Sequence, residues 1–118
     1  MSDRSCSPAQ IDAIATQLNE GNRAASNRLI SECVVNLPGV AAYAQDVSQN
    51  REAIMSGEPE AMRRSQAYFN QLAEQERQLW RNIRETSNSR NPNGLCQLEI
   101  VEDEKMGPHA NLTGDRCN

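Results

Sequence analysis

The chain has 118 residues with a formal net charge of −4, and 37% of its residues are hydrophobic. A chain of this length favours a single domain, and its acidic balance argues against binding to nucleic acid. No stretch approaches the roughly 18 apolar residues of a membrane span. Leu, Ile, Val and Phe together make up only 20 of the residues, so we expect a small hydrophobic core.

Two helices are predicted near the N-terminus. Ser7 can cap the first helix, a proline follows at its first position, and Gln10 completes the pattern of a capping box. Apolar residues then recur at helical spacing until Gly21, where the helix is expected to end. A second helix is expected over residues 23–36, because Pro38 disfavours helical backbone in the residue before it.

Two more helices are predicted in the centre of the chain. An apolar stripe indicates a helix over residues 40–55, which Gly57 should end. The strongest helical pattern begins at Pro59 and continues to about residue 86 without an internal glycine or proline. Because this last helix is much the longer of the two, either the first helical pair or a second protein chain must cover the rest of it.

The remaining residues are expected to form a tail. Residues 95–101 alternate partly between apolar and polar side chains, which indicates a short strand or an extended strap. Residues 102–118 are polar and predicted to be irregular. The sequence therefore predicts an all-α fold: a small bundle of about four helices over residues 1–90, with an irregular C-terminal tail over residues 91–118 packed on the same domain.

The four cysteines predict two disulfide bonds. None of them has the close spacing of a zinc site, and an even number of cysteines in a short chain with a small core is typical of a disulfide framework. A tight link between the first two helices makes them antiparallel, which brings Cys6 near Cys33 and leaves Cys96 to pair with Cys117. Disulfides predict a periplasmic or secreted protein, as a mature form without its signal peptide, whereas reduced cysteines would predict a cytoplasmic one.

Two charged residues interrupt the apolar stripes of the central helices. Arg51 lies in the stripe of the third predicted helix and Glu76 in that of the fourth, so both are predicted to be buried polar residues. A buried charge needs a partner or access to water. If the two helices fold back on each other, the Glu76 carboxylate should receive the free backbone N–H groups at the start of the third helix.

The long helix also carries the predicted partner surface. Arg77, Arg81 and Arg84 form a ridge that could hold an acidic partner or a phosphate chain, lie in solvent, or receive the acidic segment 102–104. Trp80 lies in the half of the helix that needs a cover. The residues predicted to contact a partner protein are Tyr68, Phe69, Arg77, Trp80, Arg81 and Arg84.

No motif in the sequence indicates catalysis. His109 is the only histidine, and there is no glycine-rich phosphate loop or metal-binding motif, so we expect no enzyme activity, no cofactor and no metal. The small core and the cysteines favour a protein-binding module, such as an inhibitor, an immunity protein or an envelope adaptor. Two alternatives stay open: a cytosolic homodimeric assembly protein with reduced cysteines, and a small-ligand carrier with Arg51 or Glu76 anchoring the ligand in a cavity between helices.

Overall fold

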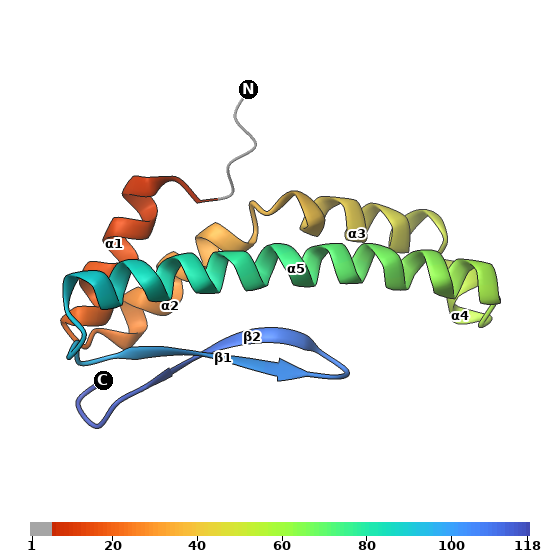
Figure 1. Ribbon diagram of the computed structural model, residues 1–118. Helices are drawn as coiled ribbons and strands as arrows, with labels where there is room; N and C mark the ends of the chain where they lie inside the picture. Colours follow the sequence, from red (N-terminus) through yellow and green to blue (C-terminus); the bar gives the residue numbers. More distant parts are fainter. Residues whose placement is uncertain (1–5) are drawn as a thin grey trace.

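The computed structural model describes residues 6–118, which form five helices and two strands (Figure 1). The elements in chain order are α1 (Pro8–Asn19), α2 (Arg23–Val34), α3 (Pro38–Gln49), α4 (Arg51–Met55), α5 (Pro59–Arg90), β1 (Gln97–Asp103) and β2 (Gly107–Thr113). Helix α5 is the central element, because α1, α3 and both strands pack against it. The protein is mostly helical, but it is not purely α-helical as predicted, since a two-stranded sheet follows the last helix.

The first two helices begin and end at the predicted signals. The Ser7 hydroxyl accepts a hydrogen bond from the backbone N–H of Gln10, and the Gln10 side chain accepts one from the N–H of Ser7, which confirms the capping box. Gly21, with a φ of +79°, forms the tight link to α2. A side chain there would also meet the carbonyl oxygen of Arg116 at 2.8 Å, so this position requires glycine.

The predicted third helix is divided in two at Asn50. This residue has φ −120° and ψ 26°, and it separates α3 from the short helix α4. Its side-chain amide donates to the backbone oxygen of Asp46 and to the Asp46 carboxylate, both at 3.1 Å. Such local side-chain hydrogen bonds compete with the helical ladder, which explains the break. The last helix continues to Arg90, four residues beyond the predicted end, and stops before Pro92.

The C-terminal residues form a β-hairpin: β1 overlaps the short strand expected within residues 95–101, whereas β2 lies where the sequence predicts an irregular tail. The Asp103 carboxylate accepts hydrogen bonds from the backbone N–H groups of Lys105 (2.8 Å) and Met106 (3.0 Å), and Gly107 takes the positive φ that closes the turn. Glycine, proline and asparagine in β2 obscure the strand in a propensity argument. Burial of Leu112 in the hydrophobic core overrides that local preference.

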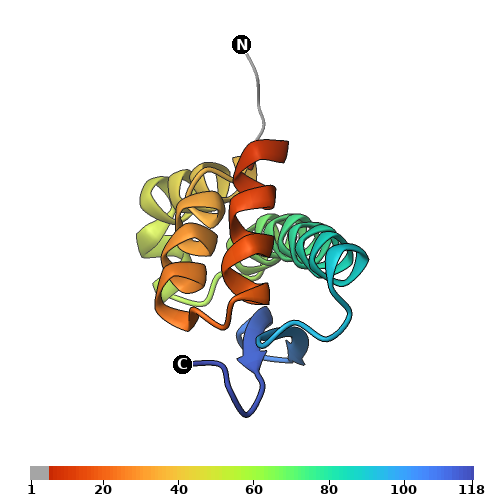
Figure 2. The same cartoon turned by 90° about the vertical axis from the view of Figure 1, so that its left-hand side faces the viewer.

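Two disulfides join the predicted pairs of cysteines. The Cα atoms of Cys6 and Cys33 are 4.9 Å apart, and those of Cys96 and Cys117 are 4.8 Å apart, both within the usual disulfide range. The first disulfide ties the start of α1 to the end of α2, and the second joins the two ends of the hairpin segment. The antiparallel arrangement of α1 and α2 is visible in Figure 2.

Most of the core lies at one end of the molecule, which we call the body. The body comprises α1, α2, residues 73–90 of α5 and the hairpin, and Figure 2 views the molecule from this end. Its buried cluster consists of apolar side chains and cysteines: Ile11, Ile14, Leu18, Ile30, Cys33, Leu37, Leu79, Trp80, Ile83, Cys96, Leu98, Leu112 and Cys117. Helix α1 of the first helical pair therefore covers the second half of α5, whereas α2 packs on α1; the first helical pair was one of the two covers predicted for α5.

The other end projects as a helical arm, at the right of Figure 1. The arm comprises α3, α4 and residues 59–72 of α5. Its buried residues are small or polar, namely Gly39, Asp46, Ala61 and Ser65. The carboxylate of Asp46 accepts from Arg64 Nε at 3.1 Å, linking α3 to α5. The larger apolar side chains of the arm are consequently left partly or fully exposed.

Candidate functional site

Trp80 is a core residue and not a contact residue for a partner. Its side chain is only 4% exposed, and its indole nitrogen is buried without a hydrogen-bond partner among the described residues. It belongs to the same cluster as Ile14 and Leu18 of α1, which lie against α5. The prediction that Trp80 meets a partner is therefore wrong, because α1 covers the part of α5 that carries it.

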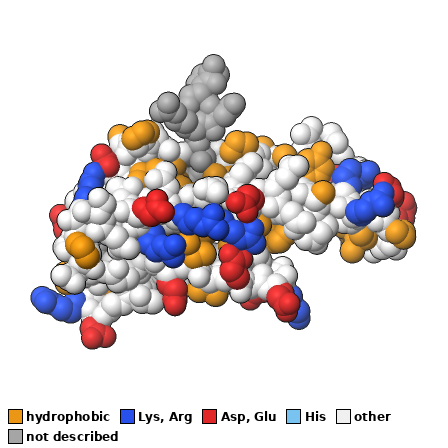
Figure 3. Space-filling model, in the orientation of Figure 1, with side chains coloured by type: hydrophobic (Ala, Val, Ile, Leu, Met, Phe, Trp, Pro, Cys, Tyr) orange, Lys and Arg blue, Asp and Glu red, His pale blue; other side chains and the backbone are white. Residues whose placement is uncertain are grey.

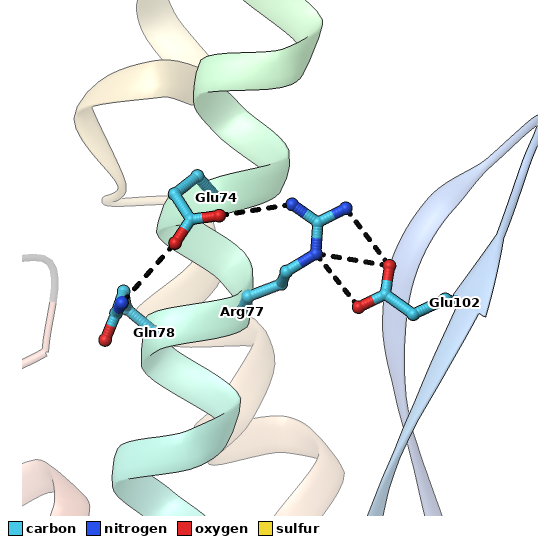
Figure 4. A network of polar contacts seen from close by, with 4 residues as sticks. All are labelled: Glu74, Arg77, Gln78 and Glu102. Atoms are coloured by element: carbon cyan, nitrogen blue, oxygen red, sulfur yellow. Dashed lines mark hydrogen bonds and ion pairs between the residues drawn. The ribbon is translucent and has the colours of Figure 1, made fainter.

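Arg77 ties the hairpin to α5 (Figure 4). Its guanidinium donates to both carboxylate oxygens of Glu102, with Nε 2.9 Å from Oε2, and to Glu74 at 3.2 Å. The hydrogen bond to Glu102 raises the pKa of Arg77 and lowers the pKa of Glu102. The acidic segment thus docks on the arginine ridge through Glu102, one of the three arrangements left open by the sequence. Gln78 completes the network by donating to Glu74 at 3.4 Å.

Among the described residues, the other two arginines of the ridge, Arg81 and Arg84, are not used to hold the hairpin by an ion pair. Arg81 is exposed and Arg84 is half-buried, and neither forms an ion pair with any residue from 6 to 118. Arg81 nevertheless lies close enough to β1 for its charge to lower the pKa of Glu102. Two guanidinium groups of the ridge, those of Arg81 and Arg84, therefore have no ion-pair partner in the described part of the chain.

Neither of the two charged residues predicted to be buried is fully buried. Arg51 is exposed at the start of α4, because the break at Asn50 rotates it out of the stripe of α3. Glu76 is half-buried, and burial raises the pKa of its carboxyl, opposed by Arg77 and His109.

The start of α3 is capped by a neighbour of Glu76. Gln75 accepts a hydrogen bond from the backbone N–H of Gly39 at 2.7 Å. Gln75 thus caps the end of α3 that Glu76 was predicted to cap. Adjacent residues of a helix point about 100° apart, so Glu76 faces a different direction. The expectation that Glu76 meets this helix end is wrong for that reason.

Phe69 and Tyr68 are the two predicted contact residues that lie in the arm. Both are half-buried. The ring of Phe69 meets Tyr43 of α3 edge-on, with ring centroids 5.7 Å apart. Phe69 also lies against Gly107 at the tip of the hairpin. The pair of Tyr43 and Phe69 therefore marks the junction where α3, α5 and the hairpin come together.

An apolar surface extends outward from this junction along the arm. We define the arm surface as the side chains that line its two adjoining hollows: Tyr43, Val47, Ile54, Met55, Met62 and Phe69. The hollows have volumes of about 290 and 600 Å³ and share Tyr43 and Ile54. Met55 is 75% exposed and Met62 48% exposed. Another methionine, Met106 at the hairpin tip, is 76% exposed.

Sequence reasoning missed this surface. Val47 and Ile54 belong to the apolar stripe that predicts the helix over residues 40–55, and helical periodicity alone does not reveal whether anything covers such a stripe. A signal was present in the methionines, because Met55 and Met62 flank the loop around Gly57 in an otherwise polar segment. Methionine is common on surfaces that bind proteins, since its flexible side chain adapts to different partners.

A third hollow is an open groove of about 740 Å³ that is lined in part by Pro38. Ile11, Leu37 and Leu79 contribute its apolar side chains, and polar residues of α5 line it as well. Neither Arg51 nor Glu76, the anchors predicted for a small-ligand carrier, lines this groove. Arg51 instead lines the hollow of about 600 Å³ beside Ile54 and Met55, so the ligand-carrier alternative stays a prediction.

Comparisons with models of known families, with curated proteins and with solved structures find no match to this chain. Among the described residues, no helix is long and apolar enough to cross a membrane. Nor does the part from residue 6 onward contain a group of three or more His, Cys, Asp or Glu side chains arranged to hold a metal ion. The function must therefore be argued from the surfaces of the molecule.

Proposed function

We propose that this protein is a small, non-enzymatic binding module that recruits another protein through the arm surface. The observation that carries this proposal is the exposure of large apolar side chains around the hollows that meet at Tyr43 and Ile54. Contiguous exposed apolar surface is typical of interaction sites. An inhibitor, an immunity protein and an envelope adaptor are all forms that such a module takes.

The shape of the arm surface favours a protein over a small ligand. Its two hollows adjoin at Tyr43 and Ile54, and Met55, which is 75% exposed, lines one of them. Charged side chains surround the apolar centre, including Arg51 and Lys105. An apolar centre with a polar rim is the usual anatomy of a protein–protein interface.

The disulfides support a location in an oxidising compartment. All four cysteines are paired, and no free cysteine occurs in residues 6–118. Structural disulfides are stable in the periplasm and outside the cell but are rare in the cytosol. We therefore propose a periplasmic or secreted module, and thiol counting on denatured native material tests this: four free thiols would contradict it.

Photo-crosslinking in the native organism tests the binding function. A photoreactive amino acid replaces Met55 in one variant and Asn88, an exposed residue of the body, in the control. We expect a defined partner to crosslink at position 55 and not at 88. Capture at both positions, or at neither, would contradict the arm as the binding surface.

The captured partner then permits a quantitative test with purified proteins. Ile54→Glu places a charge in the centre of the arm surface and should weaken binding at least tenfold, since one desolvated interface charge costs several kcal/mol. The matched control is Val35→Glu, because Val35 is 64% exposed at the end of α2 and lines neither hollow of the arm surface. Equal loss of binding in both variants would contradict the proposal.

A homodimer is the second candidate. The same exposed apolar surface favours it, because such surfaces also bury against a second copy. Sedimentation equilibrium separates the two: the proposed module is monomeric at micromolar concentration, whereas the alternative is a dimer that Ile54→Glu dissociates.

A further inference from the structure

We propose that the outer edge of β1 is a second docking site, which takes an extended acidic segment of a partner protein as an additional strand beside Arg81 and Arg84. This site is separate from the arm surface, and its existence does not depend on the function proposed above. Three features of the hairpin and of α5 carry the inference: the direction of the backbone groups, the closure of the opposite edge, and the unpaired arginines.

The direction of the backbone groups follows from β2. The carbonyl oxygen of Leu112 accepts a hydrogen bond from Arg23 of α2 at 2.6 Å, so it points away from β1. In an antiparallel strand, the N–H and C=O groups of one residue point to the same edge, and those of every second residue along the strand point to that edge too. Pro108, which has no N–H group, therefore also faces away from β1, the position in which a strand tolerates proline.

The register transfers this direction to β1. Leu98 pairs with Leu112, Ile100 with Ala110 and Glu102 with Pro108. Because these are the non-hydrogen-bonded pairs, the N–H and C=O groups of their β1 members point outward from the hairpin. Within residues 6–118 no hydrogen bond from another element reaches these groups. β1 therefore presents three residues of unpaired strand edge.

The two edges of the hairpin differ in how well they could pair with a further strand. On β2, Arg23 occupies one outward carbonyl oxygen and Pro108 removes one outward donor, so this edge is poorly suited to a further strand. On β1, no proline or bulge interrupts the pairing from Gln97 to Asp103. An unprotected edge strand is a template for strand addition by another chain.

The charges beside β1 select the chemistry of the added strand. Alternate side chains of this sheet point toward α5, as shown by the buried Leu98 and by the bond of Glu102 to Arg77. The same set of side chains on an added strand would face the ridge of α5 next to β1. Arg81 and Arg84 have no ion pair among the described residues and can each bind a carboxylate. Figure 3 shows basic side chains in the middle of this view of the molecule, with acidic side chains next to them.

A second copy of this chain is a poor occupant. Pairing β1 with another β1 would bring two copies of the ridge of Arg77, Arg81 and Arg84 together over one sheet. Like charges brought together at an interface cost several kcal/mol. The outward face would also gather the exposed carboxylates of Glu99 and Asp103 from both copies. An acidic segment of a different protein avoids the first of these clashes, and neutral side chains at its outward positions avoid the second.

The probe for this site is a nine-residue peptide of alternating glutamate and valine, with blocked ends and a fluorescent label. We expect saturable binding by fluorescence anisotropy and slowed amide exchange at Leu98, Ile100 and Glu102. Arg81→Glu should weaken binding at least tenfold, whereas Arg28→Glu, the same charge change on an exposed residue of α2, should have little effect. A peptide with lysine in place of glutamate should not bind.

Backbone methylation distinguishes strand addition from simple charge attraction. One peptide is N-methylated at its glutamates and another at its valines, so that each blocks the N–H groups on one edge only. We expect one of the two to lose binding and the other to keep it. Equal binding of both, no binding of the parent peptide, or a β1-mediated dimer in its absence would overturn the proposal.

Discussion

Helix α5 runs through two regions that are held together in different ways. In the body, it buries large side chains such as Trp80 and Ile83, and two disulfides lie in the elements around it. In the arm, it buries Ala61 and Ser65 against α3, and no disulfide reaches this region. One continuous helix thus connects a cross-linked, well-filled region to one that lacks both features.

The difference shows that most of the small hydrophobic core lies in the body. The fully buried large apolar side chains, Ile14, Leu18 and Ile83, all lie in the body. The arm instead depends on the buried carboxylate of Asp46 and on half-buried aromatic contacts. Regions with few buried apolar contacts open more easily, and binding surfaces are often drawn from them. In the proposed module the body would therefore be the scaffold, and the arm would present the binding surface.

Removal of the Cys6–Cys33 disulfide, one of the two in the body, should have one of the largest effects. The double substitution Cys6→Ser with Cys33→Ser opens a loop closed over 27 residues. We expect it to lower the free energy of unfolding by about 3 to 4 kcal/mol, since the unfolded chain regains the entropy of that loop. Urea unfolding followed by circular dichroism measures this. A loss below about 1 kcal/mol would show that the body does not depend on the cross-link.

A matched pair of isoleucines compares the packing of the two regions. Ile83 in the body is fully buried, whereas Ile54 in the arm is half-exposed. Ile83→Ala should cost about 2 to 5 kcal/mol, because it leaves a cavity in the core. Ile54→Ala should cost about 1 kcal/mol or less, since part of its surface is already in water. Equal costs in thermal or urea unfolding would remove the distinction between body and arm.

Asp46 tests what holds the arm. Its carboxylate accepts hydrogen bonds from Arg64 Nε and from the Asn50 side chain, both at 3.1 Å. Asp46→Ala should lower stability by about 1 to 2 kcal/mol, because it leaves these donors without their acceptor. The control is Glu60→Ala, which removes an ion pair between two exposed side chains and should change stability by less than about 1 kcal/mol. If both variants unfold alike, Asp46 does not hold α3 to α5.

Glu76 gives the smallest effect, and its sign depends on pH. Burial raises the pKa of this carboxyl in the folded protein, so the charged form destabilises the fold. The stability associated with the protonated form is present at low pH and is lost as pH rises through the folded pKa. Glu76→Gln should therefore raise the melting temperature at pH 7, and the gain should vanish as pH falls below the ordinary carboxyl pKa of about 4. A lower melting temperature at pH 7 would indicate that the carboxylate has a stabilising partner.

The sequence predicted features that depend on local chemistry. The capping box at Ser7, the breaks near Gly21 and Gly57, and the start at Pro59 each act within a few residues, so they could be recognised without the structure. The pairing of the cysteines also followed, because a short link makes two helices antiparallel.

Features that depend on distant residues were not predictable in this way. The strand β2 is stabilised by packing of Leu112 in the core, which its own proline and glycine do not reveal. Trp80 was expected at a partner surface because nothing in the sequence states that α1 lies over it. The arm surface was missed for the opposite reason, since a regular stripe of Val47 and Ile54 does not show that no element covers it.

Native-state hydrogen exchange tests the contrast between body and arm most directly. We predict that amides of α3 and α4 exchange through local opening, at least tenfold faster than those of α1 and of the second half of α5, a gap of about 1.4 kcal/mol or more. Amides of α3 and α4 protected as strongly as those around Ile14 and Ile83 would contradict the account, because the arm would then be as firmly held as the body.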